Sequence, residues 1–226
     1  MSGLLQQFSD AMADTFTDVQ RSLVQLRDHN GSIGAGTVWH PDGLIVTNAH
    51  VVLDLRQRGY GPWRGRTVST RELYATLSDG RSLPTQIIAV DEANDLAALA
   101  VDAEDLPIIT PGDSQALRPG QWVMALGHPW GVRDALTAGV VIGASDDLPE
   151  MQTGREWIAL NLRLRPGHSG GPLVDTHGRL VGINTMITGP EVGFAVPAHV
   201  VKRFLKQALG ENPDPADQPT AGVIPV

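Results

Sequence analysis

The first segment of the chain alternates apolar and polar residues with the period of an α-helix. Its apolar residues recur at spacings of three and four: Leu5, Phe8, Met12, Phe16, Val19, Leu23 and Leu26. Neither proline nor glycine interrupts the run from Leu4 to His29, and Asn30-Gly31 provides a stop. The pattern predicts an amphipathic N-terminal helix over residues 1–30. Two roles are open for it: a helix laid on the domain surface, or an oligomerisation arm, because the apolar stripe is close to heptad spacing.

From Gly34 onward the pattern changes to short apolar runs separated by turn residues. Thr37–Trp39 and Leu44–Thr47 flank Pro41-Asp42-Gly43, which is typical of strand, tight turn and strand. Similar runs follow along the chain: Leu73–Leu77, Gln86–Val90, Trp122–Leu126, Val140–Ile142, Trp157–Leu164, Gly171–Val174, Leu180–Ile183 and Gly193–Val196. Regular short strands with Gly and Pro turns predict an all-β fold, either a sandwich or a pair of barrels.

The strands fall into two halves. Leu106–Pro119 is rich in Pro, Gly and Asp, as expected for the join between them. Val200–Leu209 predicts a closing helix, and Gly210 ends it. The predicted division is an N-terminal helix, a β-rich domain with two halves, and a tail rich in Pro and Asp: 1–30, 31–209 (about 31–105 and about 120–200) and 210–226.

Composition excludes several classes of protein. The net charge of −8 and the pI near 5.2 argue against a nucleic-acid partner. The chain has no cysteine, so disulfides, thiolate metal sites and a cysteine nucleophile are excluded. No stretch approaches the ~18 apolar residues of a membrane span, and the N-terminus lacks the features of a signal peptide. We therefore expect no stable membrane insertion and a cytoplasmic location, with a periplasmic or secreted location if a leader has been removed.

One stretch departs from the acidic composition. Residues 53–71 contain five of the seventeen basic residues: Arg56, Arg58, Arg64, Arg66 and Arg71. A charge run of this kind is usually a solvated loop. Because the stretch comes directly after His50, a docking surface for acidic substrate segments is the alternative.

A glycine-rich segment around Ser169 carries the strongest chemical signal. It runs Pro166-Gly167-His168-Ser169-Gly170-Gly171-Pro172-Leu173. A serine hydroxyl becomes a nucleophile when a base removes its proton, and the attacked carbonyl then needs hydrogen-bond donors for its developing charge. Glycines let backbone N–H groups crowd around one point. We expect Gly167 and Ser169 to supply those donors.

A base and an acid precede this serine in the sequence. His50 closes the apolar run Leu44–Thr47, where an imidazole can be exposed yet anchored, and histidine is the natural general base. Asp95 stands at the entrance to another apolar run, where a buried carboxylate could accept the His50 Nδ1–H and fix its tautomer. From the residues alone the acid is not unique, because other carboxylates lie nearby: Asp91, Glu92, Asp102 and Asp105.

Three segments together resemble the catalytic motifs of HtrA/Deg-type serine proteases. They are Thr47-Asn48-Ala49-His50-Val51-Val52, Asn94-Asp95-Leu96-Ala97-Ala98-Leu99 and Pro166-Gly167-His168-Ser169-Gly170-Gly171-Pro172-Leu173. The resemblance extends over roughly Gly34–Leu205. It implies a chymotrypsin-like double six-stranded β-barrel, here with an N-terminal helix and a short C-terminal helix. It also implies a triad of His50, Asp95 and Ser169, and an oxyanion hole at Gly167, His168 and Ser169.

The same resemblance implies a biological role. It points to a serine endopeptidase that cleaves unfolded or flexible polypeptides in protein quality control, without a cofactor, and to a possible trimer formed through the N-terminal helix. The sequence departs from the family in three ways. His168 stands where the family usually has Asn, the stretch after His50 is longer than usual, and no PDZ domain fits after Leu209.

Substrate preference leaves two alternatives open. In this fold the strand before the nucleophile and the loop after Asn184 form the walls of the specificity pocket. If Arg163 points inward, the enzyme would prefer an acidic residue before the cut. If it points outward, Leu164 and Ile187 line the pocket and small aliphatic residues are preferred. We expect this second arrangement, because it avoids burying an unpaired charge. The predicted substrate-binding residues are Arg163, Leu164, Asn184, Thr185, Met186 and Ile187.

Two other functions compete with a protease. Gly167–Gly171 also fits the G-x-S-x-G motif of α/β-hydrolases, but that fold needs a helix after the serine and an acid and a histidine further downstream. A non-catalytic binding module would normally have lost a triad member, whereas a latent protease would keep all three. The remaining histidines show no metal-ligand spacing, so no catalytic metal is expected.

Overall fold

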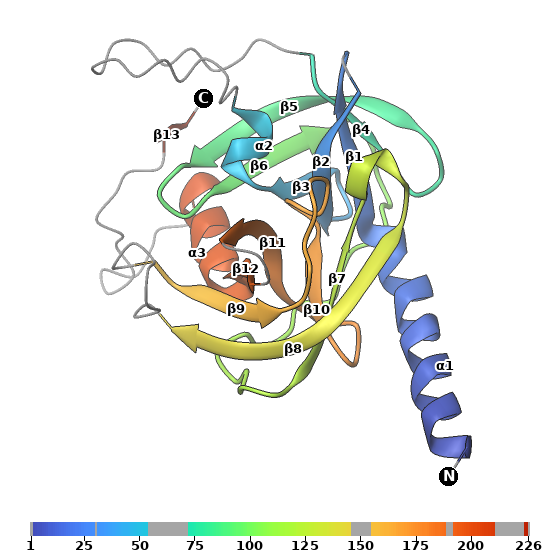
Figure 1. The fold of residues 1–226 in the computed structure, drawn as a ribbon. Coiled ribbons are helices and arrows are strands. Elements are labelled where there is room, and N and C mark those ends of the chain that lie inside the picture. Colours follow the sequence, from blue (N-terminus) through green and yellow to red (C-terminus); the bar gives the residue numbers. More distant parts are fainter. Residues whose placement is uncertain are drawn as a thin grey trace.

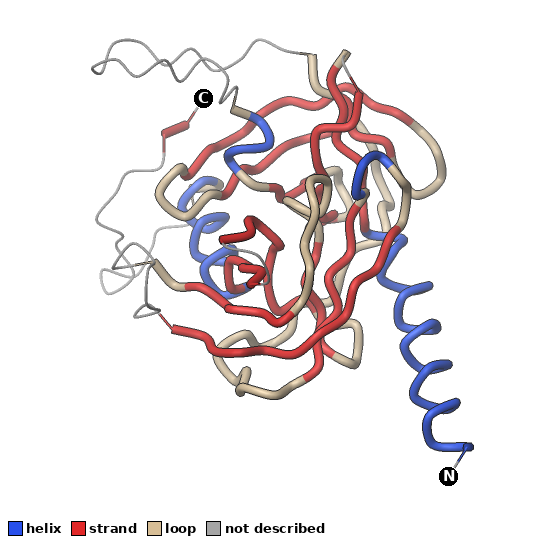
Figure 2. Tube along the Cα trace, viewed as in Figure 1, coloured by secondary structure: helices blue, strands red, loops and turns tan. Residues whose placement is uncertain are grey.

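The chain forms two antiparallel β-barrels, and helix α3 packs against both of them (Figure 1). The computed structural model describes residues 2–29, 31–53, 72–145, 155–188, 192–210 and 224–225. Strands are the commonest element of the described fold (Figure 2). The arginines expected to form a loop or docking surface after His50, Arg56 to Arg71, lie outside the described residues.

The first barrel closes through the pairing of β5 with β6. Its strands follow the order β5-β4-β1-β2-β3-β6 around the barrel, and every pairing is antiparallel. The strands are β1 (Leu23–Asp28), β2 (Gly31–His40), β3 (Leu44–Thr47), β4 (Tyr74–Thr76), β5 (Ser82–Asp91) and β6 (Leu96–Val101). The tight turn between β2 and β3 needs glycine at position 43, where φ is +88° and a Cβ atom would lie 2.1 Å from the Val101 carbonyl oxygen.

The second barrel is closed in the order β10-β11-β12-β9-β8-β7. Its strands are β7 (Trp122–Gly127), β8 (Ala135–Ser145), β9 (Trp157–Asn161), β10 (Pro172–Asp175), β11 (Leu180–Thr188) and β12 (Val192–Pro197). Residues 102–121 join the barrels without a helix or a named strand, which agrees with the expected join at Leu106–Pro119. The predicted double six-stranded barrel with one helix near each end is therefore confirmed.

Short helical elements complete the described fold. They are α1 (Ser2–Val19), η1 (Gln20–Ser22), α2 (Ala49–Val52), η3 (Pro129–Gly131) and α3 (Ala198–Ala208). Two residues of the C-terminal tail form β13 (Ile224–Pro225), which pairs with Val90 and Ala89 of β5. No helix in the described ranges is both long enough and apolar enough to cross a membrane.

The predicted N-terminal helix over residues 1–30 is too long. Helix α1 ends at Val19, and after one 3₁₀ turn Leu23 and Leu26 lie in strand β1 of the first barrel. The cause is tertiary pairing: β1 lies between β2 and β4, and five of its six residues are buried. Because both faces of this strand are covered, it lacks the alternation that marks a half-exposed strand, and a buried run of this length fits either periodicity. The first barrel therefore begins at Leu23 rather than near residue 31.

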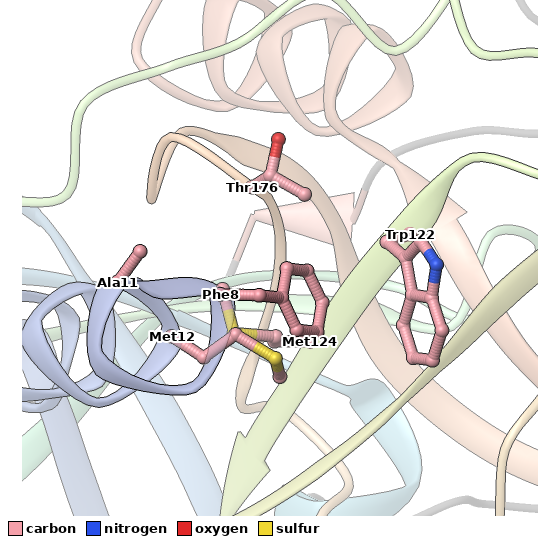
Figure 3. A pocket seen from close by; sticks show the side chains of 6 residues that line it. All are labelled: Phe8, Ala11, Met12, Trp122, Met124 and Thr176. Atoms are coloured by element: carbon pink, nitrogen blue, oxygen red, sulfur yellow. The ribbon is translucent and has the colours of Figure 1, made fainter. Parts of the chain in front are cut away.

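Helix α1 reaches away from the barrels and touches the second one through a small apolar contact (Figure 1). Phe8 and Met12 face Trp122 and Met124 around a cavity of about 70 Å³ (Figure 3). The Phe8 and Trp122 rings meet edge to face at 5.7 Å. Leu4 and Leu5 remain exposed. An oligomer formed through this helix stays a prediction.

The boundary between the barrels is held by backbone contacts around Gly170. The Ala35 amide of β2 donates to the Ser169 carbonyl at 2.8 Å, and the Thr37 hydroxyl donates to the Gly170 carbonyl at 3.1 Å. Gly170 has φ +85°, and a Cβ atom there would lie 2.0 Å from the Ala35 carbonyl oxygen. Only glycine fits this close approach, so the first barrel fixes the position of Ser169 in the second.

Candidate active site

His50 and Asp95 meet on the first barrel. His50 lies in the single turn of α2, directly after β3, and Asp95 lies in the turn between β5 and β6. The His50 Nδ1 atom is 2.9 Å and 3.0 Å from the two carboxylate oxygens of Asp95. The His50 backbone N–H also donates to Asp95 Oδ1 at 3.0 Å. The carboxylate thus holds both the ring and the backbone of His50, the arrangement that fixes an Nδ1–H tautomer and leaves Nε2 as the basic atom.

Asp95 is itself held by groups that its own sequence segment does not contain. The Thr185 hydroxyl donates to Asp95 Oδ2, and the Asn48 side-chain amide donates to the Asp95 carbonyl at 2.9 Å. The side chain is buried, with 7% of the residue exposed. Burial raises the pKa of Asp95, but the hydrogen bonds and charge of His50 and the hydrogen bond of Thr185 together hold it below its usual value. Asp95 is therefore a carboxylate at neutral pH.

Ser169 lies between the two barrels and is half-buried. Its hydroxyl donates to the Thr185 carbonyl at 2.7 Å. Among the hydrogen bonds of the described residues, none joins this hydroxyl to His50. The three candidate residues are thus brought to one place around Thr185, with the serine hydroxyl in an orientation that differs from the one needed for proton transfer to His50.

The loop before Ser169 is shaped by a second loop, residues 128–131. The His128 amide donates to the Gly167 carbonyl at 2.8 Å, and the Trp130 amide donates to the Pro166 carbonyl at 3.1 Å. The His168 amide donates to a carbonyl of the same loop, that of Arg165, at 2.9 Å. The amides of Gly167 and Ser169, in contrast, donate to no backbone acceptor within the described ranges. These are the two N–H groups that the sequence assigns to an oxyanion.

Replacing Gly167 by Ala is expected to disrupt this loop. Gly167 has φ +106°, and a Cβ atom would lie 2.2 Å from the His128 carbonyl oxygen. We expect G167A to lower kcat/KM by about 10²- to 10³-fold, the usual effect of losing an oxyanion donor, in a protein that still folds. Peptide hydrolysis and thermal unfolding measure the two effects. Gly120→Ala is the matched control, since Gly120 also has positive φ but nothing within 4 Å of its Cβ position. Equal activities for the two variants would contradict the assignment.

Two histidines are buried beneath the same loop. His128 and His168 are 1% and 3% exposed. Each Nδ1 atom faces a backbone amide at 3.1 Å, that of Asp134 for His128 and that of Arg165 for His168, and neither Nε2 atom has a partner within the described residues. Burial lowers the pKa of His128 to about 4 and also lowers the pKa of His168. Both rings are therefore neutral at pH 7, and His168 braces the loop from inside.

These buried rings predict a fold that loses stability in mild acid. In the unfolded chain His128 takes up a proton near pH 6.5, whereas in the folded protein it does so only near pH 4. The unfolded state thus binds more protons between these values, and the free energy of unfolding falls as the pH drops through this window. From His128 alone we expect the free energy of unfolding to fall by about 2 kcal/mol between pH 7.5 and pH 5. Urea unfolding of a Ser169→Ala protein, which lacks the candidate nucleophile, measures this loss of stability. Unchanged stability at pH 5 would contradict the expectation.

The predicted substrate-binding residues divide into exposed and buried positions. Arg163 is exposed, whereas Leu164 is fully buried and lies under Gly193 of β12. Asn184 is buried too, and its amide donates to the carbonyls of Leu126 and Pro172 at 3.1 Å and 3.0 Å. Thr185 binds Asp95 as described above. Met186 and Ile187 lie in β11 where its pairing with β12 shifts register, and their side chains are outside the described set.

Sequence reasoning missed two roles at this site. It placed Thr185 among the substrate contacts, whereas the hydroxyl binds Asp95 and the carbonyl binds Ser169. It gave no role to Asn48, which fixes the Asp95 backbone. No group of three or more His, Cys, Asp or Glu side chains that could hold a metal ion occurs within the described ranges.

Comparison with known proteins identifies the family of this chain. The family model described as a trypsin-like peptidase domain matches residues 34–183. The mitochondrial serine protease HTRA2 of Drosophila willistoni is 37% identical over 78% of this chain and 38% of its own length. A probable periplasmic serine endoprotease, DegP-like, of Halomonas elongata is 36% identical over 80% of this chain and 36% of its own length. The chain thus spans well under half the length of these curated relatives.

A solved structure shows the same fold. The HtrA-type protease AlgW with tripeptide superimposes with a TM-score of 0.75 at 27% identity, over 87% of this chain and 62% of that one. From the family model, the relatives and the fold together, the chain belongs to the HtrA-type, trypsin-like serine proteases.

Proposed function

We propose that this chain is a serine endopeptidase that hydrolyses unfolded or flexible polypeptides through an acyl-enzyme. The observation that carries the proposal is the pair of contacts from His50 Nδ1 to the two oxygens of Asp95, at 2.9 Å and 3.0 Å, beside the Ser169 loop. Asp95 orients His50, His50 is the general base, and Ser169 is the nucleophile. The function also rests on the relatives, which are named as serine proteases.

The reaction begins when the Ser169 hydroxyl leaves the Thr185 carbonyl and donates to His50 Nε2. As its oxygen attacks the peptide carbonyl, the proton passes to Nε2 and the carbonyl oxygen becomes an oxyanion. The amides of Gly167 and Ser169 stabilise that charge. His50 then protonates the departing amine, which leaves an ester on Ser169. Water, deprotonated by His50, cleaves the ester and restores the serine hydroxyl.

We further propose that cleavage follows small aliphatic residues. Leu164 is a fully buried apolar side chain packed under Gly193, so this part of the site offers no charged group to a substrate side chain. The exposed position of Arg163 supports the same preference, because an arginine buried at the base of an apolar pocket without a partner would be costly. Polypeptide substrates fit the relatives, one of which was solved with a tripeptide. A role in quality control and a cytoplasmic location stay predictions; the two relatives are named as mitochondrial and periplasmic.

A latent form of the enzyme is the second candidate. The hydrogen bond from the Ser169 hydroxyl to the Thr185 carbonyl favours it, because that hydroxyl must turn before it can be activated. Latency differs from loss of function, since every group of the proposed mechanism is still present.

The proposed function is tested by treating the native protein with a fluorophosphonate, mapping the adduct by mass spectrometry, and digesting casein in parallel. A single adduct on Ser169 with casein cleavage is the expected result. An adduct without cleavage would favour the latent form. Ser114 is an internal control: it is buried and hydrogen-bonded to His199, which in turn binds Glu156, so it mimics a triad without access to the reagent. An adduct there, or none on Ser169, would reject the proposal.

A further inference from the structure

An exposed indole stands one hydrogen bond away from the proposed oxyanion loop. Trp130 is 74% exposed, and its amide donates to the Pro166 carbonyl at 3.1 Å. Val132, two residues further along the same loop, is 61% exposed, so this loop presents two apolar side chains to solvent. Arg165 lies over the Trp130 ring, with its guanidinium carbon 5.9 Å from the ring centre. A cation at this distance from an indole face is attracted by the ring electrons and holds it in place.

The backbone at Trp130 adopts a strained conformation. Trp130 has φ +53° and ψ +24°, a left-handed conformation that a bulky residue adopts only when its surroundings impose it. Three backbone hydrogen bonds impose it. The amides of Trp130, Gly131 and Val132 donate to the carbonyls of Pro166, His128 and Pro129, respectively. A fourth comes from β1: the Gln25 side-chain amide donates to the Gly131 carbonyl, and it also donates to the Ser32 hydroxyl. These contacts hold the backbone at Trp130, and the Arg165 guanidinium lies against the ring itself.

The position of the ring relative to Ser169 indicates what it can touch. Two elements contact Ser169 through different atoms. The Thr185 carbonyl accepts a hydrogen bond from the serine hydroxyl. The beginning of β2 contacts the serine backbone, since the Ala35 amide donates to the Ser169 carbonyl. The loop that carries Trp130 packs against that end of β2, because a Cβ atom on Gly131 would lie 3.8 Å from the Ser32 side chain. Trp130 thus lies near the β2 end that contacts the Ser169 carbonyl, whereas the serine hydroxyl is bound by Thr185.

We propose that Trp130 and Val132, with the ring held by Arg165, form a binding site for an apolar side chain in the leaving-group half of the substrate, just after the bond that is cut. This inference rests on the proposed function, which places the residue before the cut near Leu164. The other half then leaves across the Gly167 loop toward Trp130. Three residues of extended chain reach about 10 Å, so the contact falls within the first few residues after the cut. A large exposed aromatic fixed at one place is the usual anchor for such a side chain.

The test compares two fluorogenic peptides with the same residues before the cut and either Leu or Ser at the second and third positions after it. We expect the wild type to prefer the Leu peptide, and Trp130→Ala to lower the ratio of the two kcat/KM values by about tenfold, the effect of losing one apolar contact. Alanine keeps the Cβ atom and hence the backbone strain, so the variant removes the ring alone. Trp122→Ala is the matched control, because Trp122 is also exposed but lies on β7 beside α1.

An activated ester with the same acyl half separates this inference from the proposed function. Its leaving group carries no side chain, so W130A should hydrolyse it, and react with a fluorophosphonate, at the wild-type rate. A peptide ratio that W130A leaves unchanged would overturn the inference while the protease remains. An equal loss on the ester and on both peptides would also overturn it, since Trp130 would then act through the Gly167 loop. No labelling of the wild type at Ser169 would overturn the proposed function and this inference with it.

Discussion

Ser169→Ala is expected to lower kcat for peptide hydrolysis by about a million-fold, to the residual level that the remaining groups supply, with the fold unchanged. The methyl group cannot form the acyl-enzyme, so the whole covalent route is lost. The fold should survive because the backbone carbonyl of Ser169, not its side chain, is the group that joins the barrels through the Ala35 amide. The lost hydroxyl makes one hydrogen bond, to the Thr185 carbonyl, so the expected destabilisation is about 1 kcal/mol.

The measurement is a fluorogenic peptide assay with fluorophosphonate labelling of the same preparation. Ser114→Ala provides the matched control, because it removes a buried serine that also binds a histidine but lies away from the proposed nucleophile. We expect that variant to keep wild-type kcat. Peptide cleavage by Ser169→Ala at more than a small fraction of the wild-type rate, in a preparation free of contaminating protease, would reject the mechanism.

The parts of the site that could be predicted are those written into contiguous motifs. His50 follows an apolar strand, Asp95 opens another, and Ser169 is surrounded by glycines, so each residue is marked by its own neighbours. The geometry brings the first two together at 2.9 Å, as the sequence led us to expect. The contacts that hold Asp95 in place have no such signal in the sequence. Thr185 binds Asp95 across 90 residues of sequence, and nothing in either segment encodes that pairing.

The fold shows the same division between local and distant causes. The short runs with Gly and Pro turns correctly predict strands, because each barrel strand is bounded by its own turn. The error at Leu23 and Leu26 arose where an apolar run follows a true helix without a Gly or Pro between them. The conformation of this run is decided by its pairing with β2 and β4. Strand β4 lies about 50 residues later in the sequence, so the local periodicity of the run contains no sign of that pairing.

Asp95→Asn is expected to lower kcat by about 10⁴-fold while the protein stays folded. An asparagine at this position presents an N–H group to His50 Nδ1, so the imidazole must accept there and carry its proton on Nε2. A ring with Nε2–H cannot take the proton of Ser169. With the NH2 group at the Oδ2 position, the amide oxygen still accepts from the His50 backbone N–H. The Thr185 hydroxyl, which now faces an N–H group, turns to accept from it. The variant therefore changes the tautomer more than the geometry.

The expected result separates this role from a structural one. Thermal unfolding should shift little, whereas fluorophosphonate labelling of Ser169 should slow along with peptide hydrolysis, because both need the serine proton to be removed. Asp102→Asn is the matched control: Asp102 follows β6, is exposed, and was an equally plausible acid from its sequence neighbourhood. We expect it to keep wild-type kcat. If Asp95→Asn retained activity within about tenfold of the wild type, the carboxylate would not be setting the tautomer of His50, and the proposed role of Asp95 would be rejected.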